Sequence, residues 1–342
     1  MRLLIIIFAL LHLAFRMHGQ DIHFSQFQQT PLLVNPSLTG QQVKTFRFGI
    51  NYRDQWKNFD APFKSVSGFF DGKIENNLIR NNGCDIAKDF FGYGILFFSD
   101  KAGDGNLTTT SLMLSAAYNK QLSNTLNVSL GFAFGLGNRK IDLENLTFLS
   151  QWDGTDFNNS TPEYLDQLNS SFYYFDFSSG IFISDSIASG ARVFFGTSLQ
   201  HINKPRDRFL SNNSSLERKL NFHAGIEFGN SSLKNTLSMY YSQQDVYNEL
   251  IVFDEIDVFT PNHNVKLKES RVEKYNANLS QYSYNIIGGI GLRLIPVRDV
   301  FPFIGLETKK IKSILSYDIS IISKNIPHPY NGGFELSIIL KL

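Results

Sequence analysis

Residues 45–54 read Thr-Phe-Arg-Phe-Gly-Ile-Asn-Tyr-Arg-Asp, and apolar side chains alternate there with polar or small ones. Successive side chains of a β-strand point to opposite faces, so this stretch has one apolar face and one polar face. An apolar wall that meets lipid and an inner face that meets a polar lumen are typical of transmembrane β-barrels. The two faces are Phe46, Phe48, Ile50 and Tyr52 on the apolar side, and Arg47, Gly49, Asn51 and Arg53 on the other.

The same alternation recurs along the chain between turns rich in Asn, Asp, Gly and Ser. It predicts an all-β fold, a transmembrane antiparallel β-barrel of about 14 strands, preceded by an extended N-terminal segment. Longer polar connectors at 75–89, 141–169, 204–216 and 261–281 alternate with short turns, which indicates long extracellular loops and short periplasmic turns. The predicted strands are 45–54, 62–72, 90–99, 107–119, 125–138, 171–184, 190–202, 218–229, 234–244, 248–259, 283–294, 300–307, 311–322 and 331–341.

Composition favours the barrel over a soluble two-sheet sandwich, which would also alternate apolar and polar residues. Charged residues make up 18% of the chain, below the roughly 25% of a typical soluble domain. Aromatic residues reach 14%, with 32 Phe and 14 Tyr, and aromatic girdles line both membrane interfaces of such barrels. The net charge of +1 and the lack of a basic run with interleaved aromatics give no indication of nucleic-acid binding.

Residues 1–19 have the features of a secretory signal peptide. Arg2 supplies the positive start, and the apolar run 3–15, interrupted by His12, is short for a transmembrane helix. We expect cleavage near Gly19 or Gln20; an uncleaved anchor helix is the alternative. Export would then deliver residues 20–44 as an N-terminal motif segment and residues 45–342 as a barrel in the cell outer membrane.

The N-terminal motif segment carries a specific resemblance. Residues 20–40, QDIHFSQFQQTPLLVNPSLTG, resemble the opening of mature PorP/SprF proteins, Gln-Asp-x-x-Phe-Ser-Gln-Phe followed by Pro-x-x-x-Asn-Pro-x-x-x-Gly. Residues 51–56, Asn-Tyr-Arg-Asp-Gln-Trp, are similar to the end of the family's first strand. Later pieces at 97–103, 174–180, 196–201, 316–318 and 332–337 resemble the family in the expected order. Residues 58–61 and the ending Lys341-Leu342, where a terminal aromatic residue is common, depart from the pattern.

This resemblance implies a non-enzymatic component of the type IX secretion and gliding machinery of Bacteroidota, without a cofactor. Its partners would be periplasmic ring and motor-associated proteins, the C-terminal sorting domain of a secreted adhesin, and outer-membrane lipid. The alternative is an outer-membrane porin or solute transporter, which would have an open, conducting lumen. A lipid-modifying enzyme is a weaker third class, because the chain offers no site for it.

Two groups of residues are candidates for function. The first either plugs the barrel or contacts a partner, and Asn35-Pro36 restricts its backbone to an extended or turn geometry; its members are His23, Phe24, Ser25, Gln26, Asn35 and Pro36. Within the second group, Arg53 is expected to pair with Asp318 or Glu335, and Trp56 to anchor the strand at the interface. This barrel motif consists of Asn51, Tyr52, Arg53, Gln55, Trp56, Tyr317, Asp318, Gly333 and Glu335.

Glycines at 131, 135 and 137 share one face of the predicted strand 125–138. Small residues at these positions would let the strand bend or let a plug approach closely. Both interpretations are open at the level of sequence.

We predict neither catalysis nor a metal site. The chain has no Gly-x-Ser-x-Gly or His-Glu-x-x-His motif, and its histidines lack ligand spacing. Ser198 and His201, the nearest Ser/His pair, should face opposite sides of one strand. Cys84, the single cysteine, lies in a polar connector and cannot form an intrachain disulfide. The turn 100–105 suits a plain tight turn better than a calcium loop.

Overall fold

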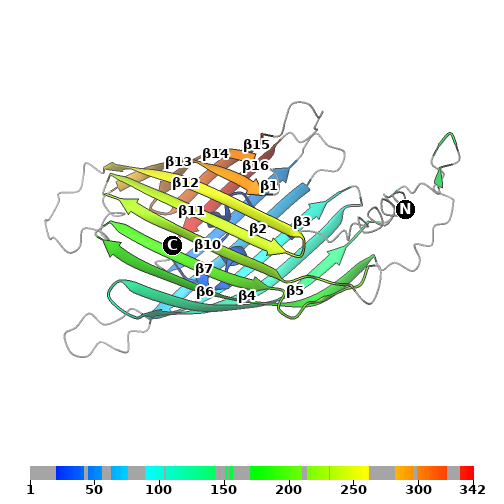
Figure 1. The fold of residues 1–342 in the computed structure, drawn as a ribbon, viewed down its shortest axis with the longest axis horizontal. Coiled ribbons are helices and arrows are strands. Elements are labelled where there is room, and N and C mark those ends of the chain that lie inside the picture. Colours follow the sequence, from blue (N-terminus) through cyan, green and yellow to red (C-terminus); the bar gives the residue numbers. More distant parts are fainter. Residues whose placement is uncertain are drawn as a thin grey trace, which may run out of the picture.

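The computed structural model describes residues 21–41, 45–55, 63–75, 89–103, 105–142, 146, 151–152, 154–156, 170–188, 190–209, 214–230, 232–261, 282–295, 299–321 and 332–342. Fourteen antiparallel strands close into one barrel, in which β1 pairs with both β2 and β16 (Figure 1). The predicted fold class and strand number are confirmed. The predicted signal peptide, Trp56 and Cys84 lie outside the described residues.

Each predicted strand corresponds to one barrel strand, and their boundaries differ by a few residues. Two further short strands, β8 (Arg206–Asp207) and β9 (Ser214–Ser215), pair with each other outside the barrel. The barrel strands are β1 (Phe46–Gln55), β2 (Phe63–Glu75), β3 (Phe90–Ala102), β4 (Leu107–Gln121), β5 (Leu126–Lys140), β6 (Ser171–Ala188), β7 (Ala191–Gln200), β10 (Lys219–Gly229), β11 (Leu233–Gln244), β12 (Tyr247–Pro261), β13 (Tyr282–Ile295), β14 (Asp299–Thr308), β15 (Ile311–Ser320) and β16 (Gly333–Lys341).

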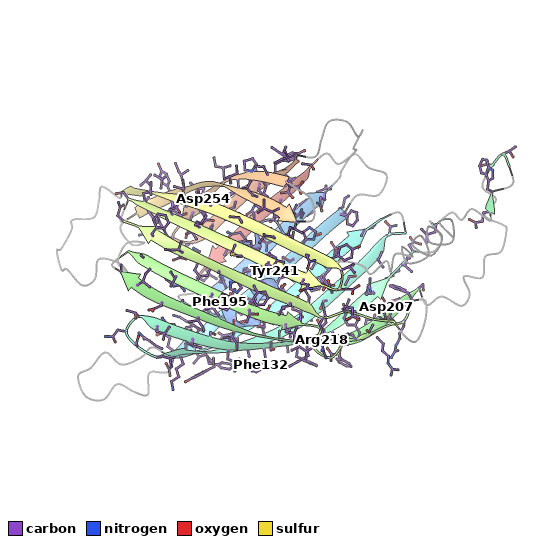
Figure 2. All side chains as sticks on the ribbon, in the orientation of Figure 1. Phe132, Phe195, Asp207, Arg218, Tyr241 and Asp254 are labelled. Atoms are coloured by element: carbon purple, nitrogen blue, oxygen red, sulfur yellow. The ribbon has the colours of Figure 1, made fainter. Side chains whose placement is uncertain are left out.

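The outer wall carries an apolar band of membrane height. On β6, the outward-facing side chains from Tyr173 to Ile183 are exposed and apolar except for Ser179. At a rise of about 3.3 Å per residue and a tilt of about 40°, that run spans roughly 25 Å along the barrel axis, close to the apolar band of known outer-membrane barrels. Aromatic rings of β5 and β6 stack across the strands, with Phe132 6.2 Å from Phe177. Figure 2 labels Phe132 on the wall of the barrel.

The interior is less polar than the strand pattern indicated, because two apolar clusters lie inside the barrel. They form where the N-terminal segment supplies apolar side chains to the inner wall. One joins Phe27 and Val34 to Tyr240, Ile251, Phe253, Ile287, Phe301, Phe303 and Ile314. The other joins Leu32 to Phe69, Leu96, Met113, Ala133 and Ile339.

The N-terminal segment, predicted to be extended, instead contains three short helical turns, and Asn35 between the second and third turn is extended. They are η1 (Phe27–Gln29), α2 (Pro31–Val34) and η2 (Pro36–Leu38). Pro31 and Pro36 each occupy the first helical position, where a missing N–H costs nothing and the fixed φ suits a helix. No helix among the described residues is long and apolar enough to cross a bilayer.

Long connectors occur at both ends of the barrel, contrary to the expected separation of long loops from short turns. We call the end where β1 begins and β16 finishes the chain-end rim; there Phe46 and Leu342 exchange backbone hydrogen bonds of 3.1 and 2.9 Å. Connectors 76–89 and 262–281 join strands at the chain-end rim, whereas 141–170 and 201–218 join strands at the opposite rim. Antiparallel order fixes this assignment, because each strand reverses the direction of the one before it.

The apolar interior predicts a large effect of Phe253→Ala. Phe253 is 0% exposed and stacks on Phe303 at 4.4 Å, so its removal leaves a cavity and should lower the free energy of unfolding by about 3–5 kcal/mol. Urea titration in detergent micelles measures this. Phe195→Ala is the matched control, since Phe195 is 47% exposed on the outer wall. Equal losses for the two variants would contradict an apolar, packed interior.

Candidate functional site

Residues 21–40 cross the barrel lumen from the opposite rim to the chain-end rim. Asp21 accepts a hydrogen bond from Gln244, the last residue of β11, at 2.9 Å. At the other end, the backbone N–H of Gly40 donates to Asp71 at 2.8 Å, and Arg47 forms a bidentate ion pair with the same carboxylate. The segment is therefore attached to the wall at both rims.

Ser25 is the centre of a buried charged cluster near the opposite rim. Its hydroxyl donates to the Asp318 carboxylate, with the two oxygens at 2.9 and 2.8 Å. It accepts hydrogen bonds from Arg53 Nη1 at 2.8 Å and Arg293 Nη2 at 2.7 Å. We call Ser25, Arg53, Arg293, Asp318 and Glu335 the Ser25 cluster.

Glu335 binds the backbone of the N-terminal segment directly. Its two carboxylate oxygens accept the N–H groups of Ser25 at 2.8 Å and Gln26 at 2.9 Å. The Gln26 side chain donates to Ser316 Oγ at 2.7 Å. Two adjacent amides on one carboxylate fix the position of the chain along the barrel axis as well as its rotation.

The predicted pairing of Arg53 is present in the structure. Arg53 Nη2 lies 2.7 Å from Asp318 Oδ2, and Nη1 lies 3.5 Å from Glu335 Oε2. Sequence reasoning missed Arg293, which lies 2.9 Å from Glu249 and 2.6 Å from Asp299. Arg293 occupies an inward-facing position of β13, and charged residues are few in this chain. These two features could have identified it from the sequence.

The two arginines of the Ser25 cluster are surrounded by more carboxylates than the cluster itself contains. Arg53 and Arg293 face four acids: Glu249, Asp299, Asp318 and Glu335. Buried ions are stable only when hydrogen bonds satisfy their remaining donor and acceptor positions. The hydroxyl of Ser25 and the amides at 25 and 26 supply such bonds, so the segment completes the electrostatics of the wall.

Asn35 forms a second attachment point in the middle of the lumen. Its amide Nδ2 donates to the carbonyls of Ile181 at 3.1 Å and Thr197 at 3.2 Å, and its Oδ1 accepts from Ser37 N at 2.9 Å. A Cβ added at Gly180 would lie 2.0 Å from Asn35 Oδ1. Glycine is therefore required at this position of β6 for Asn35 to reach the backbone.

Of the three glycines on one face of β5, Gly131 lets the plug approach. An added Cβ there would lie 2.3 Å from Ser37 N and 2.4 Å from the Pro36 carbonyl carbon. At Gly135 and Gly137 the added atom would meet neighbouring strands instead, at Leu112 and Tyr174. Close contact with the N-terminal segment explains one of the three positions.

The predicted facing of Ser198 and His201 is wrong, because β7 ends at Gln200. His201 has φ 54°, which turns its side chain inward, and its Nε2 lies 2.6 Å from Asp21 and its Nδ1 3.0 Å from Asp176. Ser198 Oγ donates to the Val34 carbonyl at 2.6 Å. Both side chains therefore point inward and contact the N-terminal segment, Ser198 at Val34 and His201 at Asp21.

Some of the remaining predicted residues point into the lumen, and others point toward the outside of the barrel. Phe24 and Pro36 are buried in the lumen, and His23 is half-buried. Asn51 points inward and donates to Ser67 at 3.2 Å, whereas Tyr52 points outward and donates to Asp54 at 3.2 Å. Tyr317 is exposed on the outer wall, and Gln55 and Gly333 face each other in the β1–β16 register.

A metal-binding group of three or more His, Cys, Asp or Glu side chains does not occur among the described residues. Cys84, Asp104, His263 and His328 lie outside them, and Asp104 belongs to the turn for which calcium was the alternative. The described lumen is suited to holding a peptide segment by hydrogen bonds and ion pairs.

Ser25→Val should destabilise the barrel strongly. It removes one donor and one acceptor from three buried charged partners, a loss of about 3 kcal/mol in the free energy of unfolding. Urea titration of the purified chain measures it, with Thr125→Val in an exposed turn as the matched control. A variant as stable as wild type would show that the cluster does not depend on the segment.

Charge reversal tests the Arg53–Asp318 pair. Arg53→Asp and Asp318→Arg should each lower the urea midpoint, since each leaves like charges facing one another in a buried site. The double variant should recover part of the loss, because Arg293 and Glu335 still face the exchanged charges. Two single variants with wild-type midpoints would rule out the pair as a stabilising contact.

His201 gives the opposite rim a pH dependence. Burial opposes its charge, but the carboxylates of Asp21 and Asp176 outweigh burial and raise the pKa of His201 to about 10. Its stabilising contribution is then full below the unfolded pKa of about 6.5 and is lost as the pH rises to about 10. Wild type should lose stability over this window relative to His201→Gln, measured as urea midpoints at pH 6 and 10. Parallel pH profiles would contradict the ion pair.

Comparison with known proteins identifies the family. The model of the family "Type IX secretion system membrane protein PorP/SprF" matches residues 17–340. Among curated proteins no match is found. Of solved structures, a deltaS2 mutant of the TodX monoaromatic hydrocarbon channel is similar with a TM-score of 0.53 and 9% identity, over 91% of this chain and 92% of the channel. The Pseudomonas putida toluene transporter TodX is similar with a TM-score of 0.50 and 10% identity, over 91% and 92%.

The likeness to TodX, at these identities, shows the fold alone. The family match covers nearly the entire chain, and it includes both the N-terminal segment and the strands that hold it. The chain therefore belongs to the type IX secretion system membrane protein family PorP/SprF.

Proposed function

We propose that the protein is a non-enzymatic outer-membrane component of the type IX secretion machinery that acts by binding other proteins, with its lumen closed by its own N-terminal segment. Family membership supports the secretion role. Burial of residues 21–40 inside the barrel supports the closed lumen. Together they favour a scaffold over a conduit.

The observation that carries the closed lumen is the set of hydrogen bonds that the segment forms with the inner wall of the barrel. Ser25, Gln26 and Asn35 are buried and hydrogen-bonded to strands on different sides of the lumen. A cavity left between the segment and the wall of β3–β7 measures about 20 Å³, room for about one water molecule. Of the two interpretations left open by the sequence, these contacts favour the plug.

Partner contact then falls to the rims and the outer wall. The chain-end rim carries the connectors 76–89 and 262–281, which are long for periplasmic turns. We propose that this rim faces the periplasm and meets the ring and motor-associated proteins. The opposite rim, with connectors 141–170 and 201–218, would meet the sorting domain of a secreted adhesin.

The second candidate function is a porin or solute transporter. The similar solved structures are named as a channel and a transporter, but their likeness shows only the fold. The two functions differ in one physical property. A porin requires a continuous aqueous path, whereas a plugged scaffold does not conduct.

Affinity isolation of the tagged full-length chain from outer membranes in mild detergent tests the proposal. We expect type IX ring components, or a large adhesin with a sorting domain, in the mass spectrum, and none of them in an isolation from untagged cells. The same material should conduct no ions in planar bilayers, because the plug fills the lumen. A chain recovered alone that conducts ions would establish the porin and contradict the secretion role.

A further inference from the structure

Asp254 places a carboxylate on the lipid-facing side of the barrel, midway along β12. Its neighbours Phe253 and Glu255 are buried inside, and Asp254 itself is partly exposed on the outer face (Figure 2). The residues opposite it in the adjacent strands, Leu237 and Ile290, are 46% and 45% exposed. Asp254 therefore lies at the depth of the apolar band.

No other strand residue that the structure describes puts an Asp, Glu, Lys, Arg or His side chain in the middle third of the outer face. The charged residues that point outward elsewhere lie near strand ends, at membrane-surface depth, and they are Asp54, Lys64, Lys101, Lys120, Lys140 and Asp185. A charge at the bilayer centre is costly, and such residues in membrane proteins face partners or polar cavities. Among the described residues, Asp254 has an amide partner, Asn235, but no cationic partner within its own barrel.

One hydrogen bond holds the Asp254 side chain in place. Asn235, which also points outward from β11, donates from Nδ2 to Asp254 Oδ1 at 2.9 Å. A carboxylate has about four acceptor positions. The contact with Asn235 occupies one of these positions.

A notch in the apolar wall lies beside Asp254. Gly288 points outward from β13, and a Cβ added there would meet no heavy atom within 4 Å. It is flanked in register by Ile256 and Ile304, and along β13 by Ile290. Small residues in a membrane-facing wall allow another backbone to approach closely. We call the outer faces of β11–β14 around Asp254 and Gly288 the Asp254 wall.

We propose that the Asp254 wall is a docking site for a membrane-embedded segment of a different protein that brings an Arg or Lys side chain to Asp254. Charge complementarity selects this occupant, because an unneutralised carboxylate at this depth calls for a cation. A second copy of this chain joined through the same wall would oppose two Asp254 carboxylates. Lipid headgroups lie at the interface, away from the middle of the strand. The inference concerns the outer wall and goes beyond the proposed secretion role.

Native gel electrophoresis of the tagged full-length chain, extracted in mild detergent, tests the docking site. Wild type should migrate as a complex heavier than the barrel alone, and Asp254→Leu should reduce that complex at least about tenfold. Asp254→Glu should retain it and Asp254→Lys should abolish it. Ser179→Leu is the matched control, since Ser179 points outward midway along β6, four strands away. Partners bound at the rims would remain in Asp254→Leu, so the comparison concerns the mass that wild type carries in excess of this variant. A complex of the same size and amount in both proteins, or wild type migrating as the barrel alone, would overturn the proposal.

Two further measurements separate docking from other roles of Asp254. Purified Asp254→Leu in lipid vesicles should have a urea midpoint equal to or above wild type, because the variant removes a charge from lipid. A lower midpoint would make Asp254 a structural residue and overturn the proposal. Co-isolation of two differently tagged copies would show a dimer, which also overturns it. The gel measures the size of the complex. Its result can therefore be interpreted whether or not the protein acts in secretion.

Discussion

The hydroxyl of Ser25 joins two guanidinium groups and one carboxylate that come from three different strands, β1, β13 and β15. Four acids surround the two arginines, and the backbone amides at 25 and 26 satisfy the carboxylate of Glu335. Without the segment, Glu335 would lose two amide donors and both arginines would lose the Ser25 hydroxyl as an acceptor, so water would have to replace them. The barrel wall and the N-terminal segment therefore form one folding unit.

The apolar clusters reinforce that dependence by a different physical effect. Phe27 stacks on Tyr240 at 5.1 Å and meets the edge of Phe253, so a ring from the segment completes a core built on the inner wall. A water-filled pore would expose this inner wall to solvent. Polar attachment near each rim and at Asn35, together with apolar packing between these points, holds residues 21–40 across the lumen.

A closed lumen directs attention to the surfaces for function. Long connectors occur at both rims, and among the described residues Asp254 is the one charged side chain in the middle third of the outer wall. In the proposed orientation the chain-end rim meets the periplasm, the opposite rim meets the cell exterior, and the outer wall meets the membrane. A protein of this design can join partners from several compartments without passing a solute, which agrees with membership of a secretion-system family.

The sequence by itself determined the barrel, its strand number and the facing of most strand residues, because a period of two in side-chain polarity is a local property of each strand. The sequence also indicated the pairing of Arg53. Its side chain was predicted to point inward, and its strand lies where the barrel closes, so only inward-facing acids of the last strands could reach it. Tertiary structure alone decided the course of residues 21–40, the apolar interior and the role of Arg293. Those features depend on which strands face one another across the lumen. His201 shows the limit clearly: a single positive φ beyond the end of β7 reversed the facing that parity predicted.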